Sequence, residues 1–315
     1  MANNRTFYAC QAVAIQRLEP DGAGDWDPVG TYEFVHGVQS VGINSNFEVE
    51  TIFELGQLEL YDTTIQVPSI EVTMEKVLDN HPTPYTLIVN GVSLLEGSKN
   101  RANVKFAIYK DTENAGVSAG LVEIECTGMY LNNITYTVPV DGNATESATL
   151  TGNHGTWSAG STITIPADIS DDDPDTADEP SGGKVLRRAD ATVTAPQGAS
   201  RLQSVTISAD LGREDLFQLG QQAPYFKAPN FPVEVTAELE YLATEDNVDA
   251  VDVSDAATAP PIENASISIA IGDYDIDLGA KCFIKSVQFG GGDAGGGNAT
   301  VQYSYATYNT LDVTV

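Results

Sequence analysis

Hydrophobic and polar residues alternate along much of the chain, a pattern that predicts β-strands. Residues 7–15, 70–77 and 233–239 each place apolar side chains on one face and charged or hydroxyl side chains on the other, as half-buried strands do. Residues 267–271 and 301–305 follow the same period of two. The sequence therefore predicts a fold dominated by antiparallel β-structure.

Turns and helices are signalled at few places. Residues 136–143 form a strand pattern that runs into an Asp-Gly dipeptide, which is typical of a tight hairpin. Residues 92–103 are a candidate for a short helix, whereas residues 47–55 fit either a helix or a strand. Residues 273–277 alternate with aspartates on one face and predict an edge strand. We expect at most one short helix in each half of the chain.

One sequence occurs twice in the chain. Residues 38–61 (VQSVGINSNFEVETIFELGQLELY) align without gaps with residues 202–225 (LQSVTISADLGREDLFQLGQQAPY). The identical pairs are Gln39/Gln203, Ser40/Ser204, Val41/Val205, Ile43/Ile207, Glu50/Glu214, Phe53/Phe217, Leu55/Leu219, Gly56/Gly220, Gln57/Gln221 and Tyr61/Tyr225. This repeat is the most informative feature of the sequence.

Weaker matches extend the repeat toward the end of each half. They are residues 70–73 with 233–236 after one deletion, 130–136 with 283–289, and 143–145 with 298–300. A repeat of about half the chain is far longer than the roughly 20–50 residues of a solenoid unit, and it has the size of a domain. We interpret it as the tandem duplication of one fold.

The duplication suggests how the chain is divided. A chain of 315 residues is long enough for two domains that each bury a core. Residues 168–183 are rich in aspartate, proline and glycine and have little apolar surface to bury, so they predict an extended linker. The predicted organisation is a first module over residues 1–167, the acidic linker 168–183, and a second, more diverged module over residues 184–315.

The chain is strongly acidic. Its formal net charge is −30, from 45 acidic and 15 basic residues. Such a chain repels a nucleic-acid backbone, so direct binding of DNA or RNA is not expected, and a channel lined by it is expected to have a negative wall. The alternative is that the acidity only solvates the surface. Hydrophobic residues at 42% and aromatic residues at 8% indicate a folded protein.

No pattern predicts a catalytic, cofactor or metal site. Cys10, Cys126 and Cys282 lack a paired spacing and predict free thiols in a reducing cytoplasm. The histidines lack zinc-site spacing, and residues 171–175 lack the ligand spacing of a calcium loop. The glycine-rich residues 290–297 lie between two strand patterns and predict a flexible hairpin loop rather than a phosphate site. We expect a structural protein, not an enzyme, without a cofactor or a metal ion.

The sequence does not predict a membrane segment. The first residues lack the basic and then apolar regions of a secretion signal, and no stretch approaches ~18 apolar residues. We therefore expect a soluble intracellular product.

The repeated segment supplies the candidate site residues. One interpretation is core packing around a turn at Gly56 and Gly220, and we expect the phenylalanine and first leucine of each copy to point inward. The polar residues that both copies retain favour a second interpretation, a contact that both modules make with neighbours. The candidate interface residues are Glu50, Phe53, Gly56, Gln57, Tyr61, Glu214, Phe217, Gly220, Gln221 and Tyr225.

At these residues the chain resembles the tail tube proteins of tailed bacteriophages. The resemblance is densest in the first half, and the second half carries it mainly through the internal repeat. The similar phrases are GVQSVGI at 37–43, IFELGQLELY at 52–61, VPSIEVTMEKVLD at 67–79 and VEIECTGMYLNNITYTVPVDGNATESATLTGN at 122–153. The family has no catalytic signature that could add to the match.

The resemblance implies a β-barrel or β-sandwich module with one flanking helix, which joins sheets with its ring neighbours around a lumen for DNA. If a ring has six modules, a duplicated chain would close as a trimer with pseudo-sixfold symmetry. The implied partners are copies of the chain itself, stacked as rings into a tube, with a tape measure protein, tail terminator and baseplate or tail-tip proteins, and possibly a contractile sheath. DNA would pass without specific binding, in a virion tail assembled from protein made in the host cytoplasm.

Two other functions are compatible with the sequence. A baseplate hub or tail-tip protein also carries paired tube-like domains, but it is present once per tail. A glycan-binding adhesin built of β-sandwiches would need exposed aromatic platforms, and Trp26 and Trp157 are the only tryptophans.

Overall fold

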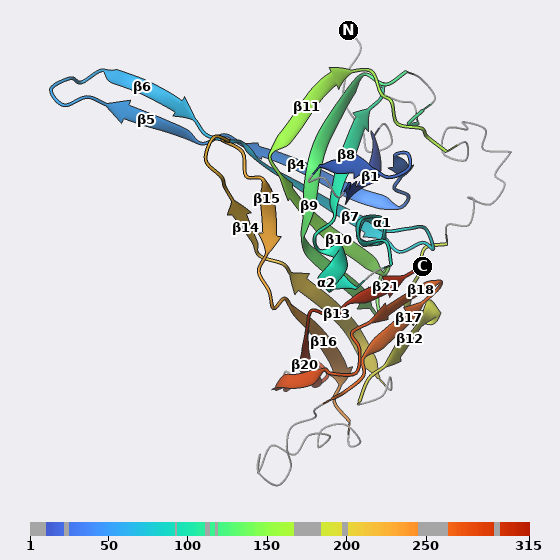
Figure 1. Cartoon of the computed structure of the whole chain (residues 1–315). Coiled ribbons are helices and arrows are strands. Elements are labelled where there is room, and N and C mark those ends of the chain that lie inside the picture. Colours follow the sequence, from blue (N-terminus) through green and yellow to red (C-terminus); the bar gives the residue numbers. More distant parts are fainter. Residues whose placement is uncertain are drawn as a thin grey trace.

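The computed structural model describes residues 11–21, 25–91, 93–110, 114–116, 119–166, 184–196, 201–244, 264–292 and 297–315. Most of them form β-strands in one large twisted sheet and one small sheet (Figure 1). Two β-hairpins extend from the large sheet at one end (Figure 1). The predicted class, mainly antiparallel β, is confirmed; the strands form no closed barrel in this part of the chain and are consistent with a sandwich.

The elements of the first half are β1 (Gln11–Pro20), β2 (Trp26–Pro28), β3 (Glu33–Phe34), β4 (Val38–Asn46), β5 (Val49–Phe53), β6 (Leu60–Ile65), β7 (Ser69–Val77), α1 (Pro84–Val89), α2 (Leu94–Gly97), β8 (Arg101–Ile108), β9 (Val122–Pro139), β10 (Thr145–Gly152) and β11 (His154–Ala159). Those of the second half are the 3-10 turn η2 (Arg188–Asp190), β12 (Ala191–Thr194), β13 (Leu202–Asp210), β14 (Arg213–Leu216), β15 (Phe226–Pro229), β16 (Glu234–Leu242), β17 (Ser268–Ile271), β18 (Tyr274–Asp277), β19 (Phe283–Gly290), β20 (Thr300–Tyr308) and β21 (Asp312–Thr314).

The main path of the large sheet consists of two equivalent units of four strands. Its order is β19-β20-β16-β13-β9-β10-β7-β4, so the second half contributes β19-β20-β16-β13 and the first half contributes β9-β10-β7-β4. The two units join where β13 pairs with β9. β13 of the second half therefore lies beside β9 of the first half, and the sheet continues from one half of the chain into the other.

Strand registers agree with most of the sequence repeat and correct one part of it. Both copies carry a β-bulge near the start of their first strand, between Val38 and Ser40 and between Leu202 and Ser204. The matches of 130–136 with 283–289 and of 143–145 with 298–300 agree with the registers of β9–β10 and β19–β20. The match of 70–73 with 233–236 is wrong by two residues, because Ser40 faces Glu75 while Ser204 faces Glu240.

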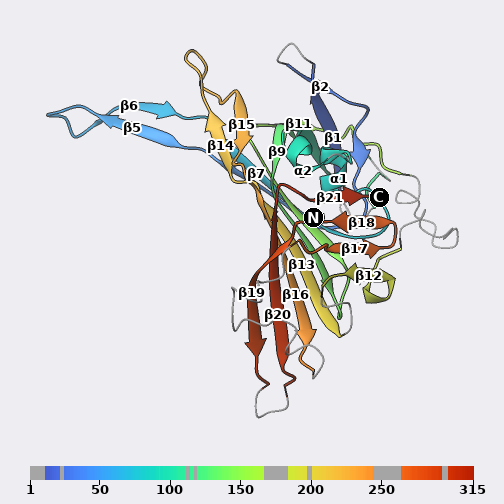
Figure 2. The same ribbon diagram turned by 60° about the horizontal axis from the view of Figure 1, so that its bottom comes forward.

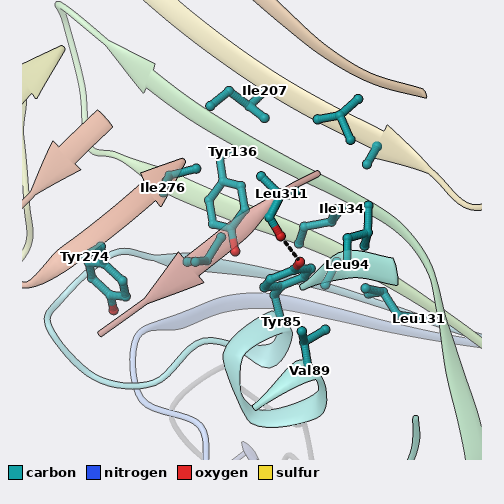
Figure 3. Packing of buried hydrophobic residues seen from close by; sticks show 14 of the residues in the cluster. Tyr85, Val89, Leu94, Leu131, Ile134, Tyr136, Ile207, Tyr274, Ile276 and Leu311 are labelled. Atoms are coloured by element: carbon teal, nitrogen blue, oxygen red, sulfur yellow. Dashed lines mark hydrogen bonds between the residues drawn. The ribbon is translucent and has the colours of Figure 1, made fainter. Parts of the chain in front are cut away.

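The two halves share one hydrophobic core. The small sheet, in the order β12-β17-β18-β21, and α1 contribute to the same cluster of buried side chains as the large sheet. Tyr85 of α1 is fully buried, lies edge-on to Tyr136 of β9, and its hydroxyl donates a hydrogen bond of 2.8 Å to the carbonyl of Leu311 (Figure 3). The Tyr274 hydroxyl donates to the carbonyl of His81. These bonds tie the second half to the first.

The expectation of at most one short helix in each half is wrong for the first half, which contains both α1 and α2. Within the candidate range 92–103 only Leu94–Gly97 is helical, and Arg101 already begins β8. The pattern did not predict α1, which starts at Pro84 because Thr83 caps it and a proline fits the first turn. Residues 47–55, which fitted either structure, contain strand β5.

Other predictions have separate outcomes. Residues 273–277 contain β18, but this strand is not at an edge, since it pairs with both β17 and β21. Cys126 and Cys282 are buried free thiols, as expected. Cys10, the linker 168–183 and residues 293–296 of the glycine-rich loop lie outside the described residues, so the module boundaries stay a prediction.

We predict that Tyr85→Phe lowers the stability of the whole chain. The substitution leaves the buried carbonyl of Leu311 without its donor, which costs about 1–3 kcal/mol. Urea unfolding followed by fluorescence should show a lower midpoint for Tyr85→Phe and no change for Tyr61→Phe, whose side chain is exposed. An unchanged midpoint for Tyr85→Phe would contradict the role of this bond.

Candidate functional site

The large sheet ends in two strands with a free edge. Within the described residues, β4 pairs only with β7 and β19 pairs only with β20. Phe289 and Val287 of β19 are 62% and 38% exposed, whereas their equivalents in β9, Tyr136 and Ile134, are 1% and 0% exposed. The β9 residues are buried where β13 pairs alongside them. The edge at β19 therefore presents core-type side chains that lack the neighbouring strand their equivalents have.

The face of the large sheet that points away from the core is polar and acidic. Serine, threonine and asparagine side chains alternate there with buried residues, as in β9 and β13. The carboxylates on this face are Glu71, Glu75, Asp210, Glu234, Glu238 and Glu240. Among the eight strands of the main path, the basic residues are Lys76, which is buried on the core side, and Lys285, which pairs with Glu234. This face therefore carries a net negative charge.

The first arm, residues 47–66, is the hairpin of β5 and β6 that extends far from the body (Figure 1). Every residue of both strands is exposed. Val49 pairs with Ile65 and Phe53 pairs with Leu60, so these apolar side chains gather on one face of the ribbon. An isolated two-stranded ribbon is marginally stable in water. The described residues of the chain leave its apolar face exposed.

The second arm, residues 213–229, is the equivalent hairpin of β14 and β15 and is docked on the first half of its own chain. The Arg213 guanidinium donates to the carbonyls of Leu131 (2.8 Å), Ser98 (2.7 Å) and Lys227 (2.9 Å). Burial lowers its pKa to about 10, so it stays charged at neutral pH. Phe226 also packs edge-on against Tyr130. The second arm also contacts the base of the first, because the Gln222 side-chain amide donates to the carbonyl of Ile65 at 2.7 Å. The second arm is thus docked on the body, whereas the first arm extends beyond it.

The tips of the two arms have the same conformation. The backbone N–H of Gln57 donates to the backbone carbonyl of Glu54 (3.2 Å), and the backbone N–H of Gln221 donates to the backbone carbonyl of Gln218 (3.4 Å). Gly56 and Gly220 both have a φ of 90°, which a turn of type II requires at its third position and which glycine tolerates. The predicted turns at these glycines are therefore present.

The structure places the candidate interface residues on the two arms. The expectation that Phe53, Phe217 and the leucines point inward is wrong: Leu55 and Leu219 are 102% and 104% exposed and the two phenylalanines 63% and 62%. These four residues lie toward the tips of the two arms, away from the core. Glu50 has a partner within its own arm, since Gln66 donates to it at 3.3 Å. Glu214, Tyr61, Gln57, Gln221 and Tyr225 are exposed.

Sequence reasoning missed the sheet edges and the clamp at Arg213. The signal for the β19 edge was available, because the repeat aligns Phe289 with Tyr136, an aromatic residue of the core. Arg213 gave no signal, since Val49 occupies the equivalent position in the first arm.

The described residues contain no group of three or more histidine, cysteine, aspartate or glutamate side chains that could hold a metal ion. In the same part of the chain, no helix has both the length and the apolar character needed to cross a membrane.

We predict that Arg213→Ala releases the second arm from the body. Three carbonyls lose a charged donor, and each stranded group costs about 1–3 kcal/mol. Amide hydrogen exchange over residues 213–229 should become at least tenfold faster, because ~1.4 kcal/mol corresponds to a factor of ten. Arg188→Ala, which removes an exposed arginine, is the control. Unchanged exchange in Arg213→Ala would show that other contacts hold the arm.

Comparisons with known proteins give distant structural likenesses. No family model matches the chain, and no curated protein matches it. The chain is similar to the tube-terminating cap of the anti-feeding prophage, with 13% identity and a TM-score of 0.34 over 50% of this chain and 94% of that chain. It is also similar to a chain of the anti-feeding prophage baseplate, with 12% identity and a TM-score of 0.32 over 50% of this chain and 97% of that chain. Both similar structures are thus parts of the anti-feeding prophage, its tube cap and its baseplate.

Proposed function

We propose that this protein is a structural component of a phage tail whose copies join edge to edge into closed rings, and that the rings stack into the tail tube. The observation that carries the proposal is the pair of free edges. β4 is the equivalent of β13, and β19 is the equivalent of β9. Since β13 and β9 pair within the chain, β4 of one copy can pair with β19 of the next in the same way.

The internal junction predicts the register between copies. Ile207 of β13 faces Tyr136 of β9, and Ala209 faces Ile134. In the equivalent register Ile43 would face Phe289, and Ser45 would face Val287. The exposed aromatic side chain of β19 would then be covered by an apolar neighbour, and each free edge would gain a partner. Such a contact is heterologous, so repetition of it must close a ring or form an open helix.

Three chains give a ring of suitable size. Each chain supplies eight strands on the main path. With strands about 4.8 Å apart and tilted by about 40° to the barrel axis, three chains form a barrel roughly 50 Å across at the backbone. Side chains narrow this opening, and the remaining channel is wide enough for a DNA duplex.

The polar face of the large sheet is the wall that we assign to the lumen. The small sheet and α1 cover the opposite face, so in a closed ring they lie outside. Carboxylates and hydroxyls on the wall repel or only weakly contact phosphates. DNA would therefore slide through the channel without adhering.

The same edges would serve a hub that forms one ring in each tail. Copy number per particle separates the two roles, because a tube requires many rings. The further partners that the tube role implies are the tape measure, terminator and baseplate proteins, with the protein located in the virion tail. An adhesin role would need a platform of exposed tryptophans. The Arg101 guanidinium lies 4.4 Å from the ring centroid of Trp26, so the exposed Trp157 on β11 is a single ring rather than a platform.

We predict that Phe289→Asp weakens ring formation without unfolding the chain. The side chain is 62% exposed in the isolated chain, so the fold loses little. The junction loses the burial of an aromatic ring, worth about 1.5–3 kcal/mol, and would have to bury a charge. The protein concentration needed for rings should rise at least tenfold, as measured by sedimentation. Leu121→Asp, at a half-exposed leucine away from both edges, should assemble normally. Equal assembly of the two variants would refute the edge junction.

We predict that lysines on the wall make the tube retain DNA. Glu238→Lys with Glu71→Lys places positive charges on the polar face, where each can pair with a phosphate. Tubes of this variant should copurify with added duplex DNA at low salt and release it at high salt, while Glu→Gln at both positions should not retain DNA. If the lysine variant forms tubes and holds no DNA, the polar face does not line the lumen.

A further inference from the structure

Three ionisable side chains meet in the core of the first half. Lys76 of β7 is fully buried, and its amine contacts the carboxyl group of Asp79, which is 5% exposed. Glu146 of β10 is 1% exposed and lies directly opposite Lys76 in the pairing of β7 with β10. Side chains of directly opposite residues rise from the same face of a sheet, with their Cβ atoms about 5 Å apart. The amine of Lys76 therefore has one carboxyl group in contact and a second one beside it.

The internal repeat shows that the fold does not need charged residues at these positions. Each half has a row of three residues that pair across neighbouring strands, and the registers make the two rows equivalent. The rows are Lys76, Glu146 and Tyr136 in the first half and Tyr241, Val301 and Phe289 in the second. Apolar residues in place of a buried ion pair are often neutral or stabilising. The first half therefore carries charged groups where the second half has only aromatic and aliphatic side chains.

Backbone and aromatic rings shield the three side chains from water. A Cβ atom on Gly37 would lie 2.5 Å from Oδ2 of Asp79, so the backbone of a glycine can cover this carboxyl group where a larger residue cannot. Tyr136 of β9 pairs with Glu146 on the side opposite β7. The backbone N–H of Tyr85 in α1 donates to Oε1 of Glu146 at 3.0 Å. Both tyrosine side chains belong to the buried cluster (Figure 3).

Burial favours the neutral forms of the lysine and the glutamate. It lowers the pKa of the Lys76 ammonium and raises the pKa of the Glu146 carboxyl group, because the core solvates a charge poorly. The bond to Asp79 acts in the opposite direction at Lys76 but does not cancel the effect of burial. A desolvated lysine amine is a nucleophile. Oε2 of Glu146 has no hydrogen-bond partner among the described residues, so it is available to take up and return a proton.

We propose that Lys76 and Asp79 condense into an isopeptide bond within the folded chain, and that Glu146 carries the proton. Nζ of the neutral amine bonds to Cγ of the protonated carboxyl group, the bond from Cγ to its hydroxyl oxygen breaks, and one water molecule leaves. Glu146 accepts a proton from Nζ and passes it to the departing oxygen, so it ends in the state in which it began. The reaction consumes no oxidant, reductant or other reactant. Its product is an uncharged amide in place of two groups that are costly to bury as ions.

The bond would fix the loop that attaches the second half of the chain to the first. This loop, residues 78–83, connects β7 with α1. The side-chain oxygen of Asn80 accepts from the backbone N–H of Asp273 at 3.2 Å, and the carbonyl of His81 accepts from the hydroxyl of Tyr274. Figure 2 shows α1, which follows the loop, beside β21 of the small sheet. The crosslink therefore lies at the contact between the halves, and it goes beyond the proposed function because it would form within a single chain, with or without rings.

Mass spectrometry of the purified chain after digestion with trypsin tests the bond. Trypsin cuts after lysines whose side chain is free, so the segment 18–99, in which Lys76 is the internal cleavage site, should stay uncut. It should also be lighter than its sequence by the mass of one water molecule, and fragment spectra should place this loss at Lys76 and Asp79. Normal cleavage after Lys76 and a full peptide mass would overturn the inference.

Variants separate the crosslink from other losses of water. Lys76→Met should restore the full mass, whereas a loss of water by cyclisation of Asp79 alone would persist. Asp79→Asn should release ammonia in place of water, because the departing group is then nitrogen. Glu146→Gln should slow the reaction roughly a hundredfold or more, as loss of a proton carrier does, while Glu71→Gln, at an exposed carboxylate of the same strand, should react normally. A loss of water that survives Lys76→Met, or equal rates in the two glutamine variants, would contradict the proposal.

Discussion

The pairing of β9 with β13 is the contact on which the rest of the structure depends. It joins two four-strand units into one sheet and lets both halves bury a single core. Their equivalents, β4 and β19, lie at the two ends of the main path of the sheet as free edges. An exposed edge invites pairing with another chain. β9 and β13 already pair within the chain. We propose that their equivalents, β19 and β4, pair in the same way between neighbouring copies.

The two copies have diverged where their environments differ. The second arm is docked through Arg213, and the first arm, with Val49 at the equivalent position, has an apolar exposed face. In a trimer the six modules would therefore present two kinds of arm in alternation. The backbone of such a trimer would have nearly sixfold symmetry, whereas its side chains would repeat only three times around the ring.

The alternation of apolar and polar residues and the internal repeat of the sequence predicted much of the fold. The alternation gave β7, β16, β17 and β20, because one-sided burial imposes a period of two. The same period hid the two-residue error in aligning 70–73, since a shift of two residues keeps every side chain on its face. Helix α1 was missed because six residues are too few to show a helical period. Its start depends on a local cap at Thr83.

The candidate residues were chosen because both copies of the repeat retain them, but the prediction that their apolar side chains point inward was wrong. Hydrophobicity alone assigns Phe53 and Leu55 to a core, yet they lie exposed on an arm that extends away from it. The free edges could not be predicted either, because β19 looks like any other strand until the order of the sheet is known. The net charge predicted a negative wall for any channel that the chain lines, but only the registers identified which carboxylates share a face.

The central claim is that copies close into a ring through β4 and β19. Counting subunits in electron-microscopy class averages of the purified assembly tests it most directly. The account predicts rings of three chains with six similar lobes. A ring of six full-length chains would contradict the trimer, and a protein that stays monomeric at high concentration would contradict the edge junction itself.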